Sequence, residues 1–179
     1  MEALPLETAL TLLLADQHPA LAAAHDELYP ERVPEGLPLS LTLLYPFAPS
    51  LEVAHHFDAL RELFRSYEPF DFELARLAQW EENGAVYAVP EPEQPLRGLM
   101  RDLWRAFPDY PPYGRPGADP PPHASLTLTG GDDREATLAR AEARLAGLLP
   151  ARFHITEVAL IEESEPDRFR LRDTFRLGA

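Results

Sequence analysis

The sequence predicts an α+β fold with two similar lobes on either side of a central cleft. A strand–helix–strand–helix–strand order occurs twice along the chain, and the expected helix at 133–148 follows its counterpart at 51–66 by 82 residues. The hydrophobic share, 45% of 179 residues, is enough for the core of one domain. We therefore expect a single domain over residues 1–179, made of two pseudo-symmetric lobes at about 1–80 and 81–179.

In the first half of the chain, changes in the spacing of apolar residues define the expected elements. Residues 8–14 form a nearly continuous apolar run and residues 70–77 alternate, whereas residues 51–66 place apolar side chains at helical spacing. The expected strands are 8–14, 39–47 and 70–77, and the expected helices are 19–28 and 51–66.

The second half of the chain repeats this order of elements and ends in one further strand. The expected strands are 85–89, 123–129, 153–161 and 169–177, and the expected helices are 96–107 and 133–148. Much of the proline, 20 residues in all, falls in the connectors. The longest of these, 108–122, also carries Tyr110, Tyr113 and Arg115, so it is a candidate lid that could close over a nucleotide.

Composition excludes several classes of function. The chain has no cysteine, which rules out disulfides, thiolate catalysis and cysteine-bound metals. All 16 basic residues are arginine, so lysine nucleophiles are ruled out as well. The net charge of −14 disfavours a long nucleic-acid duplex, whose binding depends on displacing counterions with basic groups. A small phosphorylated ligand needs only a local positive field. No apolar run approaches the length of a membrane span, and we expect a cytoplasmic monomer.

Two short strands, one in each half, carry the residues suited to chemistry. Side chains alternate between the two faces of a strand. Ser40 and Thr42 therefore share one face of the first strand, and His123 and Ser125 share one face of the second. Considered alone, each segment could be an ordinary half-buried strand, and His123 a surface histidine.

Together, the two segments resemble the paired motifs of the two-histidine, or 2′-5′ RNA ligase-like, phosphoesterases. That family carries a His-x-Thr/Ser-x motif in each lobe. The segment 122–126, Pro-His-Ala-Ser-Leu, matches the second motif, and 40–47, Ser-Leu-Thr-Leu-Leu-Tyr-Pro-Phe, matches the first except at its histidine. The resemblance covers nearly the whole chain. It implies antiparallel-rich sheets with helices packed outside and a cleft between the lobes.

The resemblance also implies a chemistry that needs neither metal nor cofactor. Opening a cyclic phosphate, or joining RNA ends, requires one group that takes a proton and another that gives one, and imidazole can do either near neutral pH. His123 would be the catalytic histidine, while Thr42, Ser125 and Ser40 would bind phosphate. Tyr45, Tyr113 and Arg115 are candidate substrate contacts. The ligand would be a small phosphorylated nucleotide or an RNA end.

Ser40 stands where the first motif has its histidine, and a serine hydroxyl does not titrate near pH 7. We therefore expect impaired catalysis, unless His25, His55 or His56 substitutes for the missing group. The alternative is a non-catalytic interaction module that has kept the fold. A different chemistry based on Glu162 and Glu163 is disfavoured, because adjacent residues on a strand face opposite ways.

Overall fold

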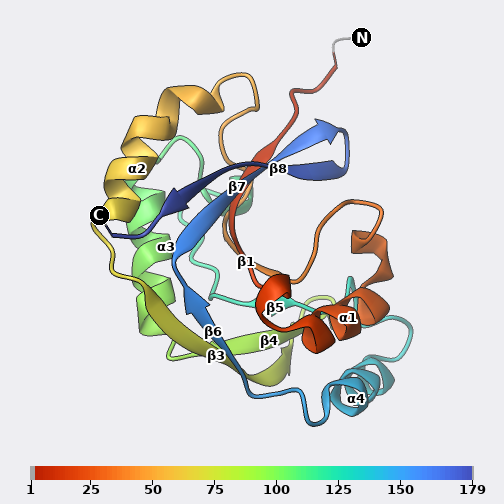
Figure 1. Ribbon diagram of the computed structural model, residues 1–179. Helices are drawn as coiled ribbons and strands as arrows, with labels where there is room; N and C mark the ends of the chain where they lie inside the picture. The colour runs from red at the N-terminus through yellow and green to blue at the C-terminus, as the bar shows by residue number, and fades with distance from the viewer. Residues whose placement is uncertain (1–2, 179) are drawn as a thin grey trace.

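The strands of the protein form two four-stranded antiparallel sheets in a computed structural model that describes residues 3–178 (Figure 1). Sheet A has the order β2-β1-β7-β8, and sheet B has the order β5-β4-β3-β6. The strands of sheet A are β1 (Thr8–Leu13), β2 (Ser40–Leu44), β7 (Glu157–Glu165) and β8 (Arg168–Arg176). The strands of sheet B are β3 (Phe70–Gln79), β4 (Val86–Glu91), β5 (Ala124–Ser125) and β6 (Ala151–Ile155).

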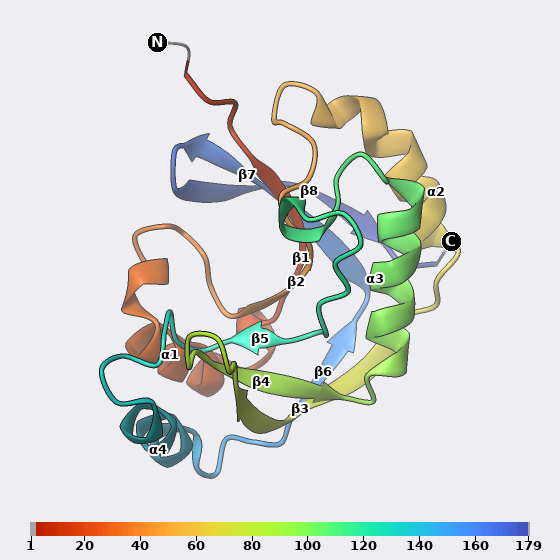
Figure 2. The same ribbon diagram turned by 180° about the vertical axis from the view of Figure 1, so that it is seen from behind.

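Helices lie on the outside of the two sheets. They are α1 (Pro19–Leu28), α2 (Phe57–Arg65), α3 (Gln94–Ala106) and α4 (Arg134–Leu145). Helix α2 contacts β8 and α3 contacts β2, whereas α1 and α4 contact each other at the far end of the molecule (Figures 1 and 2). The expected α+β class, with antiparallel sheets and outer helices, is confirmed.

The sheets divide the chain differently from the expected lobe boundary near residue 80. Strand β1 pairs with β7 at the other end of the sequence, and β3 pairs with both β4 and β6. Each sheet therefore takes strands from both halves of the chain. The pairing of β1 with β7 also places the N-terminal strand in the centre of sheet A, between β2 and β7.

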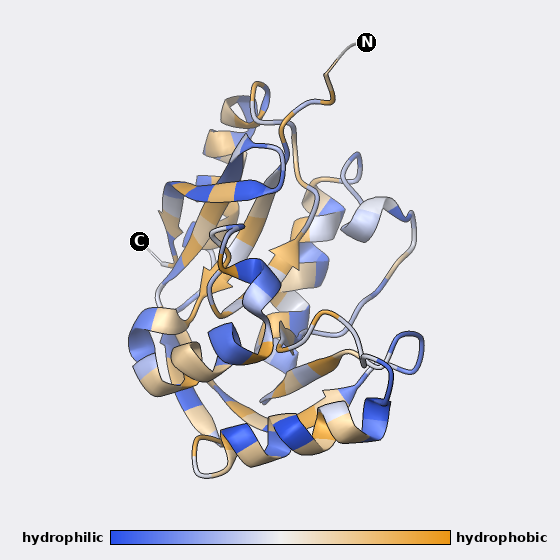
Figure 3. Ribbon diagram, turned by 90° about the vertical axis from the view of Figure 1, so that its right-hand side faces the viewer, coloured by the Kyte–Doolittle hydropathy of each residue, from blue (hydrophilic) through white to orange (hydrophobic). Residues whose placement is uncertain are grey.

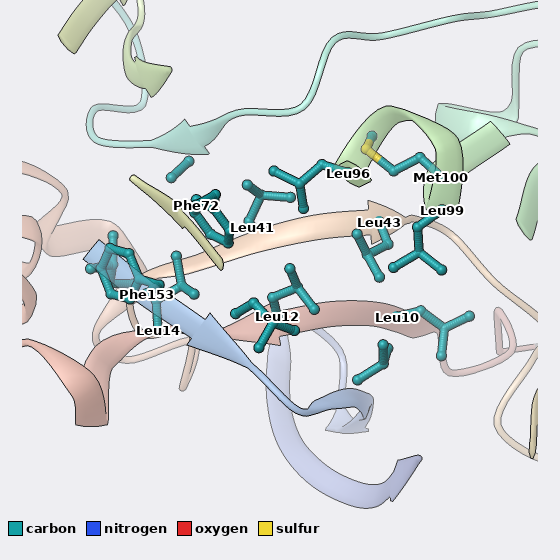
Figure 4. Close-up of a cluster of buried hydrophobic side chains, with 14 of the residues drawn as sticks. Leu10, Leu12, Leu14, Leu41, Leu43, Phe72, Leu96, Leu99, Met100 and Phe153 are labelled. Atoms are coloured by element: carbon teal, nitrogen blue, oxygen red, sulfur yellow. The ribbon is translucent and has the colours of Figure 1, made fainter. Parts of the chain in front are cut away.

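The core lies where the two sheets and α3 meet. Leu10 and Leu12 of β1 and Leu41 and Leu43 of β2 are buried on one face of sheet A. Their alternation leaves the intervening residues on the opposite face. Figure 4 shows these leucines beside Phe72 and Phe153 of sheet B and three α3 side chains, Leu96, Leu99 and Met100. Figure 3 shows apolar residues along the central strands, and hydrophilic residues alternating with apolar ones along the helices and along β8.

Three expected elements differ from the structure. The expected strand 153–161 is two strands, β6 and β7, which belong to different sheets. Residues 51–66 begin as a turn and a 3-10 segment, Val53–His56, before α2 starts at Phe57. The expected strand 123–129 is reduced to the two residues of β5. It ends because the Val86 carbonyl accepts from both Leu126 and Thr127, while the Thr127 hydroxyl accepts from the Val86 amide. Thr127 is consequently buried, with its hydroxyl bonded to the backbone of β4.

Within residues 3–178, the helices are all too short or too polar to span a membrane.

Candidate functional site

A cavity of about 350 Å³ opens on the face of sheet A opposite the core. Its walls come from all four strands of sheet A, from α1 and the segment after it, and from the chain around β5. Six of the residues expected from the sequence line it: Ser40, Thr42, Tyr45, Tyr113, His123 and Ser125.

Strand alternation explains why β2 presents hydroxyls to the cavity. Leu41 and Leu43 are buried in the core, whereas Ser40 and Thr42 are half-buried on the cavity face. Thr42 pairs with Thr11 of β1, which also lines the cavity and whose hydroxyl donates to the Leu41 carbonyl at 3.0 Å. Both neighbouring strands therefore line the cavity, and three of their lining residues, Ser40, Thr42 and Thr11, carry hydroxyls.

His123 is held just before β5 by one hydrogen bond and two aromatic rings. Its Nδ1 lies 2.8 Å from the Pro121 carbonyl, which can only accept, so Nδ1 carries a proton. Nε2 is then the basic nitrogen of the neutral ring. The imidazole meets Trp80 and Tyr87 edge-on, with centroids 5.0 and 5.7 Å away. Burial lowers the pKa of His123 and favours the neutral form.

The two motif strands lie close together, as their sequences predicted. Residues of β2 and β5 come within 8 Å of each other between Cα atoms, although the strands belong to different sheets. Ser125 pairs with Tyr87 of β4 and is half-buried beside the cavity. Hydroxyls from β2 and β5 thus flank the space in front of His123.

The three other histidines considered from the sequence have different surroundings. His25, on α1, lines the cavity and is only 4% exposed. Its Nδ1 is 2.9 Å from the Asp26 carboxylate. His56 lies outside the cavity against Phe47 and Phe107, and its neighbour His55 is exposed.

Arg32 supplies a positive charge that the sequence did not single out. It lies in the cavity wall, 3.3 Å from the Glu35 carboxylate and stacked over the Tyr29 ring at 4.8 Å. Arg115, the expected cationic contact, is exposed and is not part of the wall. The proline-rich connector around Arg115 gave no information about where its side chain points. Arg32 ends the short 3-10 segment Pro30–Arg32, which follows α1 after Tyr29.

The tyrosines join the proline-rich connector to the end of β2. The Tyr113 amide donates to the Tyr45 carbonyl at 2.6 Å. The Tyr45 hydroxyl donates to the Glu7 carboxylate, and burial together with that carboxylate raises the tyrosine pKa. Tyr45 also meets Phe169 edge-on at 6.5 Å. Tyr45, Tyr113 and Phe169 therefore give one end of the cavity an aromatic wall.

Glu162 and Glu163 have structural roles. The Glu162 carboxylate accepts from Ser50, Arg170 and Arg172, and the Glu163 carboxylate accepts from the amides of Glu7 and Asp167. Neither glutamate lines the cavity. Across residues 3–178, no three His, Asp or Glu side chains are grouped so as to hold a metal ion.

Several solved structures share this fold. The apo form of Escherichia coli LigT matches with a TM-score of 0.62 at 18% identity, covering 99% of this chain and 100% of LigT. The protein TT0787 of Thermus thermophilus matches with a TM-score of 0.58 at 19% identity, covering 96% and 97%. A structure described only as a phosphoesterase gives a TM-score of 0.57 at 18% identity, covering 98% and 100%. These likenesses define the class of fold as that of the LigT-like 2H phosphoesterases.

The sequence itself establishes the family. The model of the 2′-5′ RNA ligase superfamily matches residues 13–167, which include both motif strands, and the chain belongs to that superfamily. No curated protein matches the sequence.

Proposed function

We propose that the cavity binds a small phosphorylated nucleotide or an RNA-end phosphate and acts on it as a slow cyclic phosphodiesterase or ligase-like enzyme. One observation carries the proposal: the hydroxyls of Ser40, Thr42 and Ser125 converge with His123 on one cavity. Hydroxyls donate hydrogen bonds to phosphate oxygens, and Arg32 adds the positive charge that a phosphate requires. Escherichia coli LigT, which has the same fold, was solved with ATP, with phosphate and with 3′-AMP.

The proposed reaction is proton transfer around phosphorus. In hydrolysis of a 2′,3′-cyclic phosphate, the water oxygen bonds to phosphorus and a base takes the proton of the water. The bond from phosphorus to one ribose oxygen breaks, and an acid protonates that oxygen. Nε2 of His123 suits one of these roles. Ser40 stands at the position of the other motif histidine and cannot fill it, so turnover by the two motifs alone should be slow.

Ligand binding is the first test. Thermal unfolding is measured with 3′-AMP, 2′,3′-cyclic AMP and inorganic phosphate, for the wild type and for Thr42→Val and Ser125→Ala. We expect protection of the wild type, by about 2.7 kcal/mol at 100 times the dissociation constant, and weaker protection of both variants. Ser66→Ala, an exposed serine at the end of α2, is the matched control. No protection by any of these ligands would favour the non-catalytic interaction module instead.

Turnover is the second test. Hydrolysis of 2′,3′-cyclic AMP is followed in the wild type, His123→Gln and Ser40→His. Removing an acid–base group should lower kcat by about 10² to 10⁴, and restoring the motif histidine should raise kcat. If His123→Gln loses no activity and Ser40→His gains none, the cavity is not a phosphodiesterase site.

A further inference from the structure

We propose that His25 is the second acid–base group of this cavity and performs the proton transfer that Ser40 cannot. The inference rests on the proposed function and extends it, because it gives the site two imidazoles from different structural origins. His123 comes from the second motif, while His25 comes from α1, which lies outside both motifs. Both side chains line the same cavity as Ser40.

Helix α1 places His25 on its inward face. Pro19 occupies the first turn, and the His18 side chain accepts from the Leu21 amide at the start of the helix. The buried positions are Leu21, Ala24, His25 and Leu28, which follow the i, i+3, i+4, i+7 spacing of one helix face. The imidazole therefore replaces an apolar side chain in a core stripe, at the point where that stripe reaches the cavity.

The hydrogen bonding of His25 leaves one nitrogen available. Nδ1 is bonded to the Asp26 carboxylate at 2.9 Å, and Nε2 has no hydrogen-bond partner among residues 3–178. No fully buried side-chain nitrogen or oxygen in that same stretch lacks a partner. Nε2 of His25 is therefore not sealed in the core, and the cavity is the space that this residue lines.

His25 and His123 are anchored in the same way. Each imidazole is fixed through Nδ1 to an oxygen acceptor, Asp26 in one case and the Pro121 carbonyl in the other. This anchoring fixes the tautomer and leaves Nε2 for the substrate. A histidine that served only to fill the core would need no such access. The pair thus provides the two titrating nitrogens that a phosphodiester reaction uses.

The surroundings of the two rings differ in a way that divides the roles. Burial lowers the pKa of both rings, and at His25 alone a carboxylate, that of Asp26, opposes this effect and favours the charged imidazolium. His123 faces the rings of Trp80 and Tyr87, which favour the neutral form. His123 is therefore assigned to take the proton of the attacking water, and His25 to protonate the ribose oxygen as its bond to phosphorus breaks.

The experiment uses the full chain and two readouts, hydrolysis of 2′,3′-cyclic AMP and binding of 3′-AMP. We expect His25→Gln to lower kcat by about 10² to 10⁴ while the dissociation constant of 3′-AMP changes by less than about threefold. The double variant His25→Gln/Ser40→His should regain at least about tenfold in kcat over His25→Gln, because it returns the imidazole to β2. His55→Gln removes an exposed histidine and should keep wild-type kcat.

Three results would overturn the inference. The first is a kcat of His25→Gln that equals the kcat of the wild type. The second is a wild type that binds 3′-AMP and hydrolyses no cyclic phosphate, which leaves the binding function standing. If His25→Gln does not fold, the test uses Asp26→Asn instead, at a half-exposed position. The third result is then an unchanged kcat and an unchanged pH profile in Asp26→Asn, which contradict the role of His25. Absence of binding by any phosphate ligand would instead remove the proposed function itself.

Discussion

At the scale of single residues, Arg32 is the cation of the cavity wall. It is half-buried, paired with Glu35 and stacked on Tyr29, so its guanidinium is already oriented before a ligand arrives. Preorganisation of this kind reduces the entropy lost on binding. Its partner Glu35 lies in the same wall, which means that a phosphate must compete with that carboxylate for the guanidinium.

Replacing this cation should weaken phosphate binding more than it weakens folding. We expect Arg32→Gln to raise the dissociation constant of 3′-AMP about tenfold, the low end of what a hydrogen bond to a charged group contributes. Isothermal titration at two salt concentrations measures the effect and should show a weaker salt dependence in the variant. Arg65→Gln, at an exposed arginine of α2, is the matched control. Equal affinities for wild type and Arg32→Gln would exclude Arg32 from the phosphate site.

The two cavity histidines also predict how stability depends on pH. Burial lowers the pKa of His25 below its ordinary 6.5, against the opposing effect of Asp26 and with a smaller contribution from Arg32. Burial lowers the pKa of His123 in the same direction. As pH falls through 6.5, the unfolded chain takes up these protons before the folded chain does, so the free energy of unfolding decreases.

Urea unfolding at several pH values between 8 and 5 measures this dependence. We expect a flatter curve for His25→Gln, and for His123→Gln, than for the wild type or His55→Gln. Carboxylates with lowered pKa, such as Glu162, lose their contribution only nearer pH 4.5 and below, so the two effects separate. A stability curve that is identical in all four proteins would show that neither ring is neutralised by folding.

At the scale of elements, the segment between α1 and β2 forms part of the cavity wall and rests on β8. The Phe169 amide donates to the Glu35 carbonyl at 2.8 Å, and Gly36 has a φ of +71°. A Cβ placed on Gly36 would lie 2.5 Å from the Phe169 carbonyl oxygen. The backbone of this segment therefore fits against β8 only with glycine at this position.

Gly36→Ala should consequently damage both stability and the cavity. The left-handed φ alone costs about 1 kcal/mol for an alanine, and the clash with Phe169 adds to this cost. Gly117→Ala is a matched control, since its φ is +80° and nothing lies within 4 Å of an added Cβ. We expect the larger loss of unfolding free energy in Gly36→Ala, together with weaker 3′-AMP binding. Equal losses of unfolding free energy in both variants would mean that the segment moves away from Phe169 without a cost in stability.

Elements with a strong local signal were predictable, and those set by distant contacts were not. The alternation in residues 40–44 and the helical spacing in residues 19–28 each specify one element, and both are present. The end of β5 depends on Val86, and no local signal in residues 123–129 records that contact. Strand β1 pairs with residues of β7 that lie 148 to 154 positions further along the chain, so the sequence could not show how strands divide between the sheets.

At the scale of the whole molecule, the sequence likewise predicted only those cavity residues whose direction follows from local alternation. The alternation rule placed Ser40, Thr42, His123 and Ser125 toward one space, since three of them lie on β2 or β5 and His123 directly precedes β5. Helix α1 has a definite inner face too, but its position relative to β2 and β5 is a tertiary property. The location of His25 in the cavity therefore became visible only in the structure, as did the aromatic rings around His123.

The charge of the whole protein sets a final expectation about ligand size. A net charge of −14 repels a polyanion at every approach, while the cavity wall offers a single arginine in the part of the chain that the structure describes. Binding of a long duplex depends on neutralising many phosphates at once, and each contact contributes through counterion release. A mononucleotide or an RNA end needs only the local field of Arg32 and the hydroxyls of the two motif strands.

Competition binding can separate these two kinds of ligand. Fluorescence anisotropy would compare a labelled short single-stranded RNA ending in a 2′,3′-cyclic phosphate with a labelled RNA duplex of about 30 base pairs, both at physiological salt. We expect the single strand to bind, and unlabelled 3′-AMP to displace it because both occupy one cavity. The duplex should show no binding at micromolar protein. Tight duplex binding that falls steeply with salt would instead indicate an extended basic surface, which the predominance of acidic over basic residues, 30 to 16, makes unfavourable.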